Sequence, residues 1–329
     1  MQDIENIKVD VINVKHNVIP SVACINMNIP SVKLNVNQLE DINDVENVVK
    51  NENNFVHQND IENDETKKEE KEYNKEMEEI MIKEMKKDEM KMIIENKINE
   101  QKYINDKMRR ILIDWIFEVV TYEFRCSLDT FLLTVNIINL YSSIDLSIKK
   151  ENYQLIGLSS LHIAMKYNEI INHSIDDFVI VCDHAYNKTT IIEYENNIMN
   201  RLKYNFIIPT SLDFIRIYDM KIHSTTTQHW LSKYLILLTT LDSDFINCSP
   251  SFIASIALYC QRSLMHIKPE WNDDIYEITG YSIISIYYYA TKLLTIYTTQ
   301  SKSNNHTSSM YKIFSSVGCD SVSTLTISF

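Results

Sequence analysis

The residue types that most often perform chemistry are present in this sequence, but their spacing assembles none of the common catalytic sites. The nine histidines lie apart, without the HExxH pair that binds zinc in metalloproteases. Asp183 and His184 place an acid beside an imidazole, yet no nucleophile accompanies them. His162 lies within an apolar run, where a hydrogen-bonded core histidine is the simpler interpretation. Because GxGxxG and P-loop motifs are also absent, we expect no enzyme activity and no cofactor.

The six cysteines show no metal-binding spacing such as CxxC. So few cysteines in a chain of 329 residues favour buried, reduced thiols over a disulfide framework. The net charge of -13 argues against nucleic-acid binding, which needs basic residues to neutralise phosphates. The first residues resemble no signal peptide, and no apolar run reaches the ~18 residues of a membrane span. We therefore expect no metal, no nucleic acid and no membrane partner, and a location in the nucleus or cytoplasm or both.

The elements that carry these residues are predicted to be helices. The chain contains only 3 glycines and 5 prolines, and helix-forming residues dominate it. Between residues 106 and 208 the apolar periodicity predicts five helices, near 106–124, 128–142, 150–168, 174–183 and 188–204. Pro209 ends this block, and five more helices follow near 210–220, 227–242, 249–264, 271–279 and 282–297. The predicted fold is therefore all-α, with two tandem five-helix domains at 106–208 and 209–298.

The regions outside these domains differ in composition. Residues 1–70 are rich in Asn, Val and Ile with no evident partner segment, and we interpret them as mostly disordered. Residues 71–105 are dense in Glu, Lys and Met at helical spacing, which predicts a charged, amphipathic helix that packs on the domains or on a partner. Residues 299–329 are predicted to be a polar tail. Expected helix caps are Asp106, Ser174, and Thr189 or Thr190.

The stretch MRRILIDWIFEVV, residues 108–120, combines a helical stripe with a recognisable residue order. Met108, Ile111, Leu112 and Trp115 have offsets 0, 3, 4 and 7, so they share one helix face, and periodicity alone predicts a core stripe. The order resembles the cyclin-box signature of A- and B-type cyclins, M-R-x-I-L-x-D-W-L-x-E-V. Further segments resemble the same family in the same order, and together they cover about residues 106–297: YQLIGLSSLHIAMKYNEI, IDDFVIVCDHAY, YENNIMNRLKYNFIIPT, LLTTLDSDFINCSPSFIASIALYCQR and TGYS.

The resemblance implies a function without catalysis. Cyclins bind a cyclin-dependent protein kinase and hold its regulatory helix and activation segment in the active arrangement. Binding therefore shifts the kinase population from the inactive to the active conformation. By motif, Lys166 matches the lysine that bonds backbone carbonyls beside the kinase helix, and Glu195 matches its glutamate partner. The pocket for an apolar residue of the kinase helix is then expected to be lined by Ile163, Ala164, Tyr167, Met199, Tyr204 and Phe206.

The resemblance also implies a substrate-docking patch. In the family, a shallow apolar groove on the first helix binds Arg-x-Leu peptides of substrates or inhibitors. The matching positions here are Met108, Ile111, Leu112, Trp115, Glu118 and Gln154. Glu118 is expected to pair with the arginine of the peptide through charge-assisted hydrogen bonds.

Three positions depart from the family pattern. The family pairs its first-helix arginine, here Arg109, with an aspartate, but this chain has Asn139, so a hydrogen bond can survive while an ion pair cannot. Asn168 replaces the first acid after the lysine motif, whereas Glu169 keeps the second. Arg110 replaces a small residue beside the docking patch and adds positive charge. These departures bear on which kinase and which peptides are bound.

Two other classes of helical protein share parts of this pattern. A cyclin-fold adaptor in transcription would need a basic face and a metal-binding ribbon, and the sequence shows neither. A helical scaffold unrelated to kinases would share the composition but not the ordered motifs.

Overall fold

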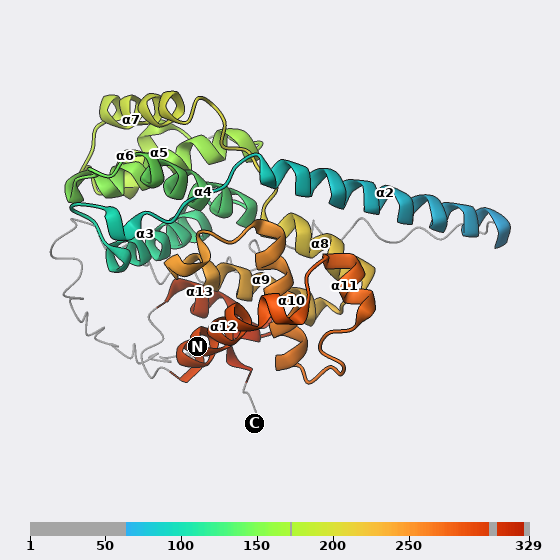
Figure 1. Ribbon diagram of the computed structural model, residues 1–329. Coiled ribbons are helices and arrows are strands. Elements are labelled where there is room, and N and C mark those ends of the chain that lie inside the picture. The colour runs from blue at the N-terminus through green and yellow to red at the C-terminus, as the bar shows by residue number, and fades with distance from the viewer. Residues whose placement is uncertain (1–63, 172, 303–307, 326–329) are drawn as a thin grey trace, which may run out of the picture.

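The computed structural model describes residues 64–171, 173–302 and 308–325, and these residues form helices joined by loops, without any strand. The predictions for residues 1–63, including the thiol of Cys24, lie outside this part of the chain. Figure 1 shows two groups of helices beside each other and a long helix, α2 (Asp64–Met90), that projects from the junction between them.

The first domain consists of α3 (Asp106–Glu118), α4 (Leu128–Ile144), α5 (Lys150–Asn168), α6 (Ile175–Val181) and α7 (Lys188–Arg201). α5 lies at its centre and packs against α3, α4 and α7, because its apolar residues surround it on nearly all sides. Gly157 lets α3 approach closely, since a Cβ atom at this position would come within 2.8 Å of Cδ1 of Leu112.

The second domain repeats this arrangement with α8 (Ser211–Lys221), α9 (Thr226–Thr240), α10 (Pro250–Leu264), α11 (Asp273–Thr279) and α12 (Ile283–Lys302). α9 and α10 form its centre, and fully buried tyrosines from α8, α9 and α12 fill the core. α11 ends at Gly280, whose φ of 76° is a left-handed conformation that glycine adopts at little cost. The prediction of two tandem five-helix domains is confirmed.

Local capping differs from the prediction at two of three helix starts. Ser174 and Asp177 form the expected capping box at α6. α3 is capped instead by Asn105, whose side chain accepts from the backbone N–H of Met108 at 3.0 Å, and α7 by Asn187. Neighbouring Asn, Asp and Thr residues all suit a cap, so composition alone did not identify the one in position.

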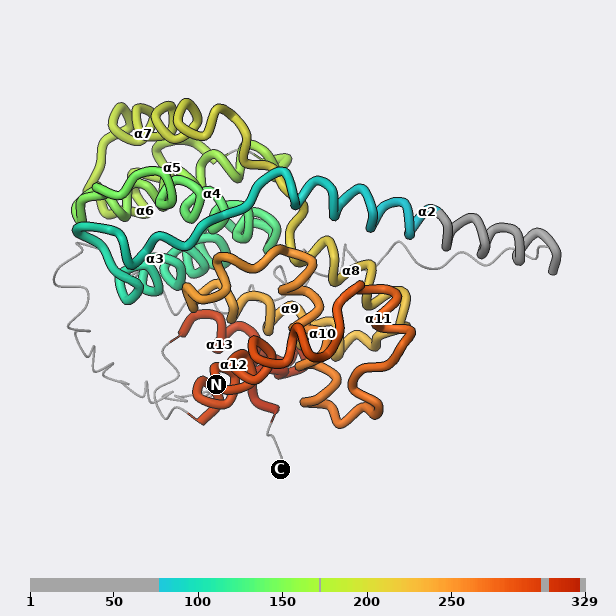
Figure 2. The backbone as a smooth tube through the Cα atoms, in the orientation of Figure 1, coloured from blue at the N-terminus to red at the C-terminus, as the bar shows by residue number. Residues whose placement is uncertain are grey.

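The helix predicted for residues 71–105 ends earlier than expected. α2 stops at Met90, and the chain to Asn105 is irregular apart from one short 3₁₀ turn, η3 (Ile98–Glu100). Asn96 donates through Nδ2 to the carbonyl of Ser243 in the second domain at 2.7 Å, and Gln101 donates through Nε2 to the carbonyl of Asp145 in the first at 2.6 Å. These tertiary contacts outweigh helix propensity, and Figure 2 shows the segment crossing the first domain toward α3.

The polar tail predicted for residues 299–329 is wrong for most of the described part. α12 continues to Lys302, and after the gap a further helix, α13 (Ser309–Phe314), leads into two 3₁₀ turns, η6 (Val317–Cys319) and η7 (Val322–Thr324). Phe314 is buried and stacks on Tyr234 of α9, with ring centroids 5.1 Å apart. A few well-spaced apolar residues among serines are thus enough to bury this segment in the second domain.

The second half of α2 is fixed to the second domain. Glu89 is buried and accepts hydrogen bonds from the backbone N–H of Ser251 at 2.9 Å and from its hydroxyl at 2.6 Å. Lys86 donates to the carbonyl of Thr279 at 2.6 Å. Glu78 pairs with Lys221 at 3.1 Å. The predicted packing of this helix on the domains is therefore confirmed for its second half.

Candidate functional site

Helices α5 and α7 bring Lys166, Glu195 and His162 together on the first domain. The ammonium group of Lys166 donates to one carboxylate oxygen of Glu195. Nδ1 of His162 lies 2.8 Å from the other oxygen. The three side chains form the predicted Lys–Glu pair with His162 as an additional member, which sequence reasoning had assigned only to the core.

The electrostatics of this cluster favour an ionised glutamate. Burial by itself would raise the pKa of Glu195, but His162 and Lys166 together hold it below its ordinary value. The Glu195 side chain is only 14% exposed, whereas that of Lys166 is 45% exposed. A lysine ammonium has three donors, so Lys166 can keep its bond to Glu195 and still donate to backbone carbonyls of a partner.

The six residues expected to line a kinase pocket divide into two sets. Ile163, Ala164 and Phe206 are buried in the core of the first domain, so little of their surface is accessible to a partner. Tyr167 and Tyr204 are exposed, at 55% and 63%, and Met199 is half-buried. Only Tyr167, Tyr204 and Met199 are accessible at the surface. The motif did not predict this difference, because it identifies a position on a helix without showing which neighbouring residues cover that position.

Exposed isoleucines next to these tyrosines were missed by sequence reasoning. Ile170 and Ile171 directly follow α5 and are 99% and 76% exposed, and Ile207 follows α7 at 46%. Large apolar side chains gathered at the surface mark interaction sites more often than chance would place them there. The signal was the pair of isoleucines that continues the AMKYNEI motif beyond the helix.

The docking-patch residues come from α3 and α5, and most of them are buried. Leu112 and Gln154 belong to the interior, Met108 and Trp115 are less than one tenth exposed, and Ile111 and Glu118 are half-buried. Burial raises the pKa of Glu118, and the neighbouring carboxylate of Asp114 raises it further. The accessible part of the patch is therefore the strip formed by Ile111 and Glu118.

Asp114, which sequence reasoning missed, joins this strip to the end of the chain. Its Oδ1 accepts from the hydroxyl of Ser308 at 3.0 Å and from the backbone N–H of Ser309 at 3.2 Å. These groups open α13, so a carboxylate of α3 caps the last helix and holds it against the first domain. Asp114 lies four residues before Glu118, on the same helix face, and that spacing was the available signal.

Of the three departures from the family pattern, Asn139 keeps a polar contact with Arg109. Nε of Arg109 donates to Oδ1 of Asn139 at 3.1 Å, as predicted for a hydrogen bond without an ion pair. Glu169, the acid that is kept, accepts from the backbone N–H of Ser127 at 2.9 Å and so secures the start of α4 to the end of α5. Asn168 and Arg110 are exposed.

Comparisons with known proteins agree with this architecture. The model of the cyclin N-terminal domain matches residues 79–207, and that of the cyclin C-terminal domain matches residues 209–328. The chain belongs to the cyclin family. This cyclin is 34% identical to G2/mitotic-specific cyclin-B of Patella vulgata over 194 residues, which cover 59% of this chain and 47% of the relative. It is 31% identical to G2/mitotic-specific cyclin S13-7 of Glycine max over 186 residues, 56% of this chain and 71% of the relative.

A solved structure shares the fold. A viral cyclin from Herpesvirus saimiri superposes with a TM-score of 0.55 at 16% identity, over 65% of this chain and 93% of the viral one. The match to Cyclin-B2-4 of Arabidopsis thaliana, at 30% identity and 57% of this chain, spans 43% of the plant protein. The cyclin thus spans less than half the length of some relatives that it matches.

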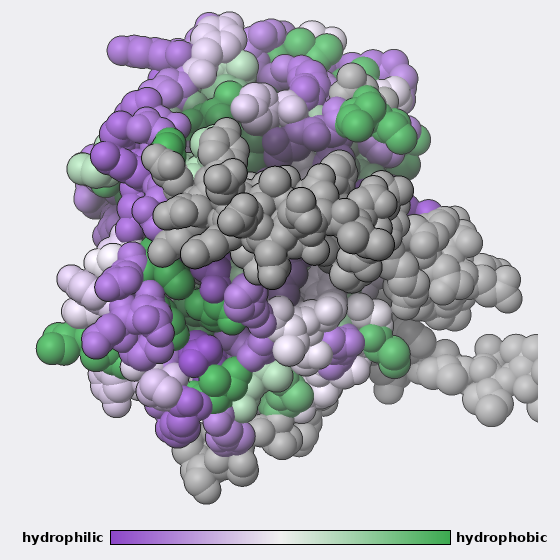
Figure 3. Space-filling model, turned by 90° about the vertical axis from the view of Figure 1, so that its right-hand side faces the viewer, coloured by the Kyte–Doolittle hydropathy of each residue, from purple (hydrophilic) through white to green (hydrophobic). Residues whose placement is uncertain are grey.

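The described residues contain neither a metal-binding cluster nor a membrane-spanning helix. Within them, no three His, Cys, Asp or Glu side chains cluster in a way that could hold a metal ion. No helix in that part of the chain is long and apolar enough to cross a membrane. No disulfide joins any two of the five cysteines that the structure describes, and all of them but Cys248 are buried. On the face shown in Figure 3, the coloured hydrophobic residues occur in separate groups among hydrophilic ones.

Proposed function

We propose that this cyclin is the non-catalytic regulatory subunit of a cyclin-dependent serine/threonine protein kinase, which it binds and activates in cell-cycle control. The observation that carries the proposal is the Lys166–Glu195 pair on the surface of α5 and α7. The residue types and positions of this pair match the family motif. In addition, relatives of this cyclin carry the names of mitotic cyclins.

The surroundings of the pair suit a protein partner. The free donors of Lys166 can bond carbonyls at the end of a partner helix, while Glu195 fixes the direction of the ammonium. Tyr167, Tyr204 and the exposed isoleucines beside them offer apolar and aromatic side chains, which dominate the energetics of protein interfaces. A kinase helix bound here is held in one of its two positions, and this differential affinity activates the kinase.

A second part of the proposal concerns substrates. Ile111 and Glu118 form a half-exposed apolar and acidic strip that suits an Arg-x-Leu peptide. Arginine supplies a charge-assisted hydrogen bond to Glu118, and leucine covers Ile111.

The test of kinase binding is co-purification from cells with the full chain as bait. Wild-type protein is expected to capture a kinase that phosphorylates a histone-type substrate, and Lys166→Ala with Glu195→Ala is expected to capture none. The matched control is Lys188→Ala with Asp176→Ala, which removes another exposed ion pair of the first domain at 2.6 Å. Circular dichroism checks that each variant remains helical.

Two results would contradict the proposal. Equal capture by the wild type and the Lys166/Glu195 double variant places the kinase interface elsewhere. If the wild-type protein is helical but captures no kinase, the fold is as described and the proposed function is wrong.

A further inference from the structure

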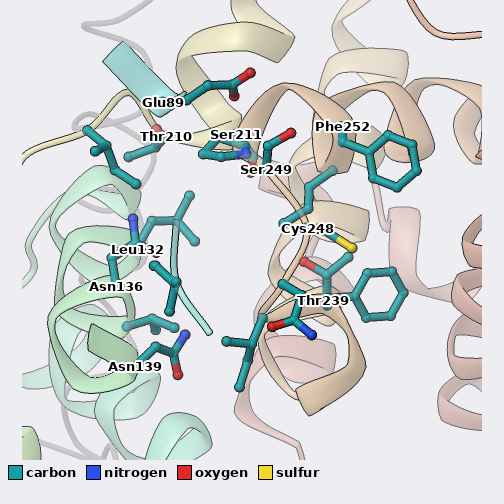
Figure 4. Close-up of a pocket in the computed structure, with 18 of the residues that line it drawn as sticks. Glu89, Leu132, Asn136, Asn139, Thr210, Ser211, Thr239, Cys248, Ser249 and Phe252 are labelled. Atoms are coloured by element: carbon teal, nitrogen blue, oxygen red, sulfur yellow. The ribbon is translucent and has the colours of Figure 1, made fainter. Parts of the chain in front are cut away.

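A cavity of about 600 Å³ lies between the two domains. Figure 4 shows Leu132, Asn136 and Asn139 of α4 on one side and Thr239, Cys248 and Phe252 of the second domain on the other. The segment that follows α2 contributes Met92, Ile93 and Ile94 to its wall. Cavities that hold small ligands in proteins measure roughly 300–1,000 Å³ and are mostly apolar, with a few polar groups that orient the ligand. Both properties hold here.

Three charged residues line the cavity, and two of them are already satisfied. Glu89 accepts two hydrogen bonds from Ser251, and Lys86 donates to the carbonyl of Thr279. Glu89 and Asn139 lie at opposite ends of the cavity in Figure 4. Because Arg109 is hydrogen-bonded to Asn139, Glu89 and Arg109 lie at different ends of the cavity.

Arg109 is a buried cation whose directly bonded counter-charge is missing among the residues that the structure describes. Its side chain reaches from α3 to both domains, with Nε bonded to Asn139 and Nη1 donating to the carbonyl of Thr240 at 2.8 Å. The residue is only 2% exposed, and its Nη2 donates to no group within the described parts of the chain. Burial lowers the pKa of Arg109, yet a guanidinium stays charged in proteins.

The nearby acids make no hydrogen bond to Arg109 among the described residues. Asp106 and Asp242 act on Arg109 through space only, and Asp242 is paired with Lys292 at 2.9 Å. No ion pair joins Arg109 to an acid among the residues that the structure describes. A buried charge is costly without a partner, so an arginine facing a cavity in this state favours an anionic occupant.

We propose that the cavity binds a small organic anion with a carboxylate and an apolar body. The carboxylate pairs with Nη2 of Arg109, where a planar guanidinium offers directed donors. The body lies along Leu132, Val135 and Ile236, which line the cavity between the domains. Asn139 makes this site possible, because it keeps the hydrogen bond to Arg109 but carries no charge. The aspartate of the family pattern would instead form an ion pair with the guanidinium at this position.

The test uses octanoate, acetate and octan-1-ol as probes of the full chain, by titration calorimetry and thermal unfolding. Octanoate is expected to bind and to raise Tm, acetate to bind at least tenfold more weakly, and octan-1-ol to bind at least tenfold more weakly as well. The variant Asn139→Asp is expected to weaken octanoate binding at least tenfold and to raise Tm without a ligand, because it supplies the missing charge.

Two further variants complete the experiment. Asn197→Asp adds the same charge at an exposed position of α7 and is expected to bind octanoate like the wild type. Arg109→Gln removes the cation and is expected to bind octanoate no better than octan-1-ol. The proposal is wrong if wild type binds no octanoate, if octan-1-ol binds equally well, or if Asn139→Asp binds octanoate like the wild type. None of these readouts depends on kinase binding.

Discussion

Arg216 of α8 and Asp129 of α4 form a two-point ion pair that joins the second domain to the first. Nη2 of Arg216 donates to Oδ2 of Asp129 at 2.6 Å, and Nη1 donates to Oδ1 at 3.1 Å. Both side chains are about one third exposed or less, at 34% and 26%. Two parallel bonds between planar groups fix orientation as well as distance, so this pair constrains how the domains sit against each other.

Replacing Arg216 with Lys should lower the free energy of unfolding by about 0.5–1 kcal/mol, because an ammonium lacks the planar pair of donors that makes two parallel bonds to one carboxylate. Urea unfolding of the full chain measures the effect. A double-mutant cycle with Asp129→Asn isolates the pair itself. If the two changes add without coupling, the ion pair contributes nothing to the domain arrangement.

A second prediction concerns the effect of a substitution at Gly157 on stability. A Cβ atom there would lie 2.8 Å from Cδ1 of Leu112, whose side chain is fully buried and has little room to move. Although alanine is the better helix former, Gly157→Ala should therefore destabilise the protein, by about 1–3 kcal/mol as is typical of overpacking. Thermal unfolding measures the change.

The cause of that loss can be checked with Leu112→Ala. Removing Leu112 alone costs about 2–5 kcal/mol, because it leaves a cavity. In the double variant, the methyl group added at position 157 enters that space, so the combined loss should be smaller than the sum of the two. A combined loss equal to the sum would mean that the clash at Leu112 is not the cause.

The pKa of Glu118 gives docking a distinctive pH dependence. Burial and Asp114 raise that pKa in the free protein, so the neutral form of Glu118 persists to a higher pH than for an ordinary glutamate. An Arg-x-Leu peptide needs the ionised form. Its affinity should therefore fall as the pH drops through the raised pKa, and the decline should begin at a higher pH than an ordinary glutamate would give.

Fluorescence anisotropy with a labelled peptide, between about pH 8 and pH 4, measures this decline over a range that includes the ordinary glutamate pKa of about 4.3. The loss of one charge-assisted hydrogen bond is worth about 1.5–3 kcal/mol, or at least about tenfold in affinity. Glu118→Gln should bind at the weak level throughout and show no such decline. A wild-type affinity that does not change over this range would place Glu118 outside the docking site.

The sequence predicted the helices of both domains because their apolar spacing is a local property. α5 is an example, since its apolar residues on every side indicated a central helix. Burial of single residues was not predictable in this way. Trp115 and Phe206 fit a surface motif by residue order, yet other helices cover them, and such coverage depends on contacts distant in sequence. The irregular conformation of the segment after Met90 was also not predictable. It depends on hydrogen bonds from Asn96 and Gln101 to two different domains.

α2 provides the last prediction, because the contacts with the second domain that are described for it follow residue 70. Glu78, Lys86 and Glu89 hold the helix to α8, α10 and the end of α11. Deleting residues 1–70 should therefore leave Tm and kinase activation unchanged. Deleting residues 1–90 should lower the stability by at least about 2 kcal/mol, since it removes the buried bonds of Glu89 to Ser251 and the burial of Ile82.

A matched pair of point variants separates these contacts from the mere presence of the helix. Glu89→Ala leaves the backbone N–H of Ser251 buried without its acceptor, whereas Glu84→Ala removes a glutamate that is 57% exposed on the same helix. Both changes favour helix formation equally, so only Glu89→Ala should lower Tm. If Glu84→Ala lowers Tm as much, or if deletion of residues 1–70 abolishes kinase activation, α2 acts through residues other than those that hold it to the second domain.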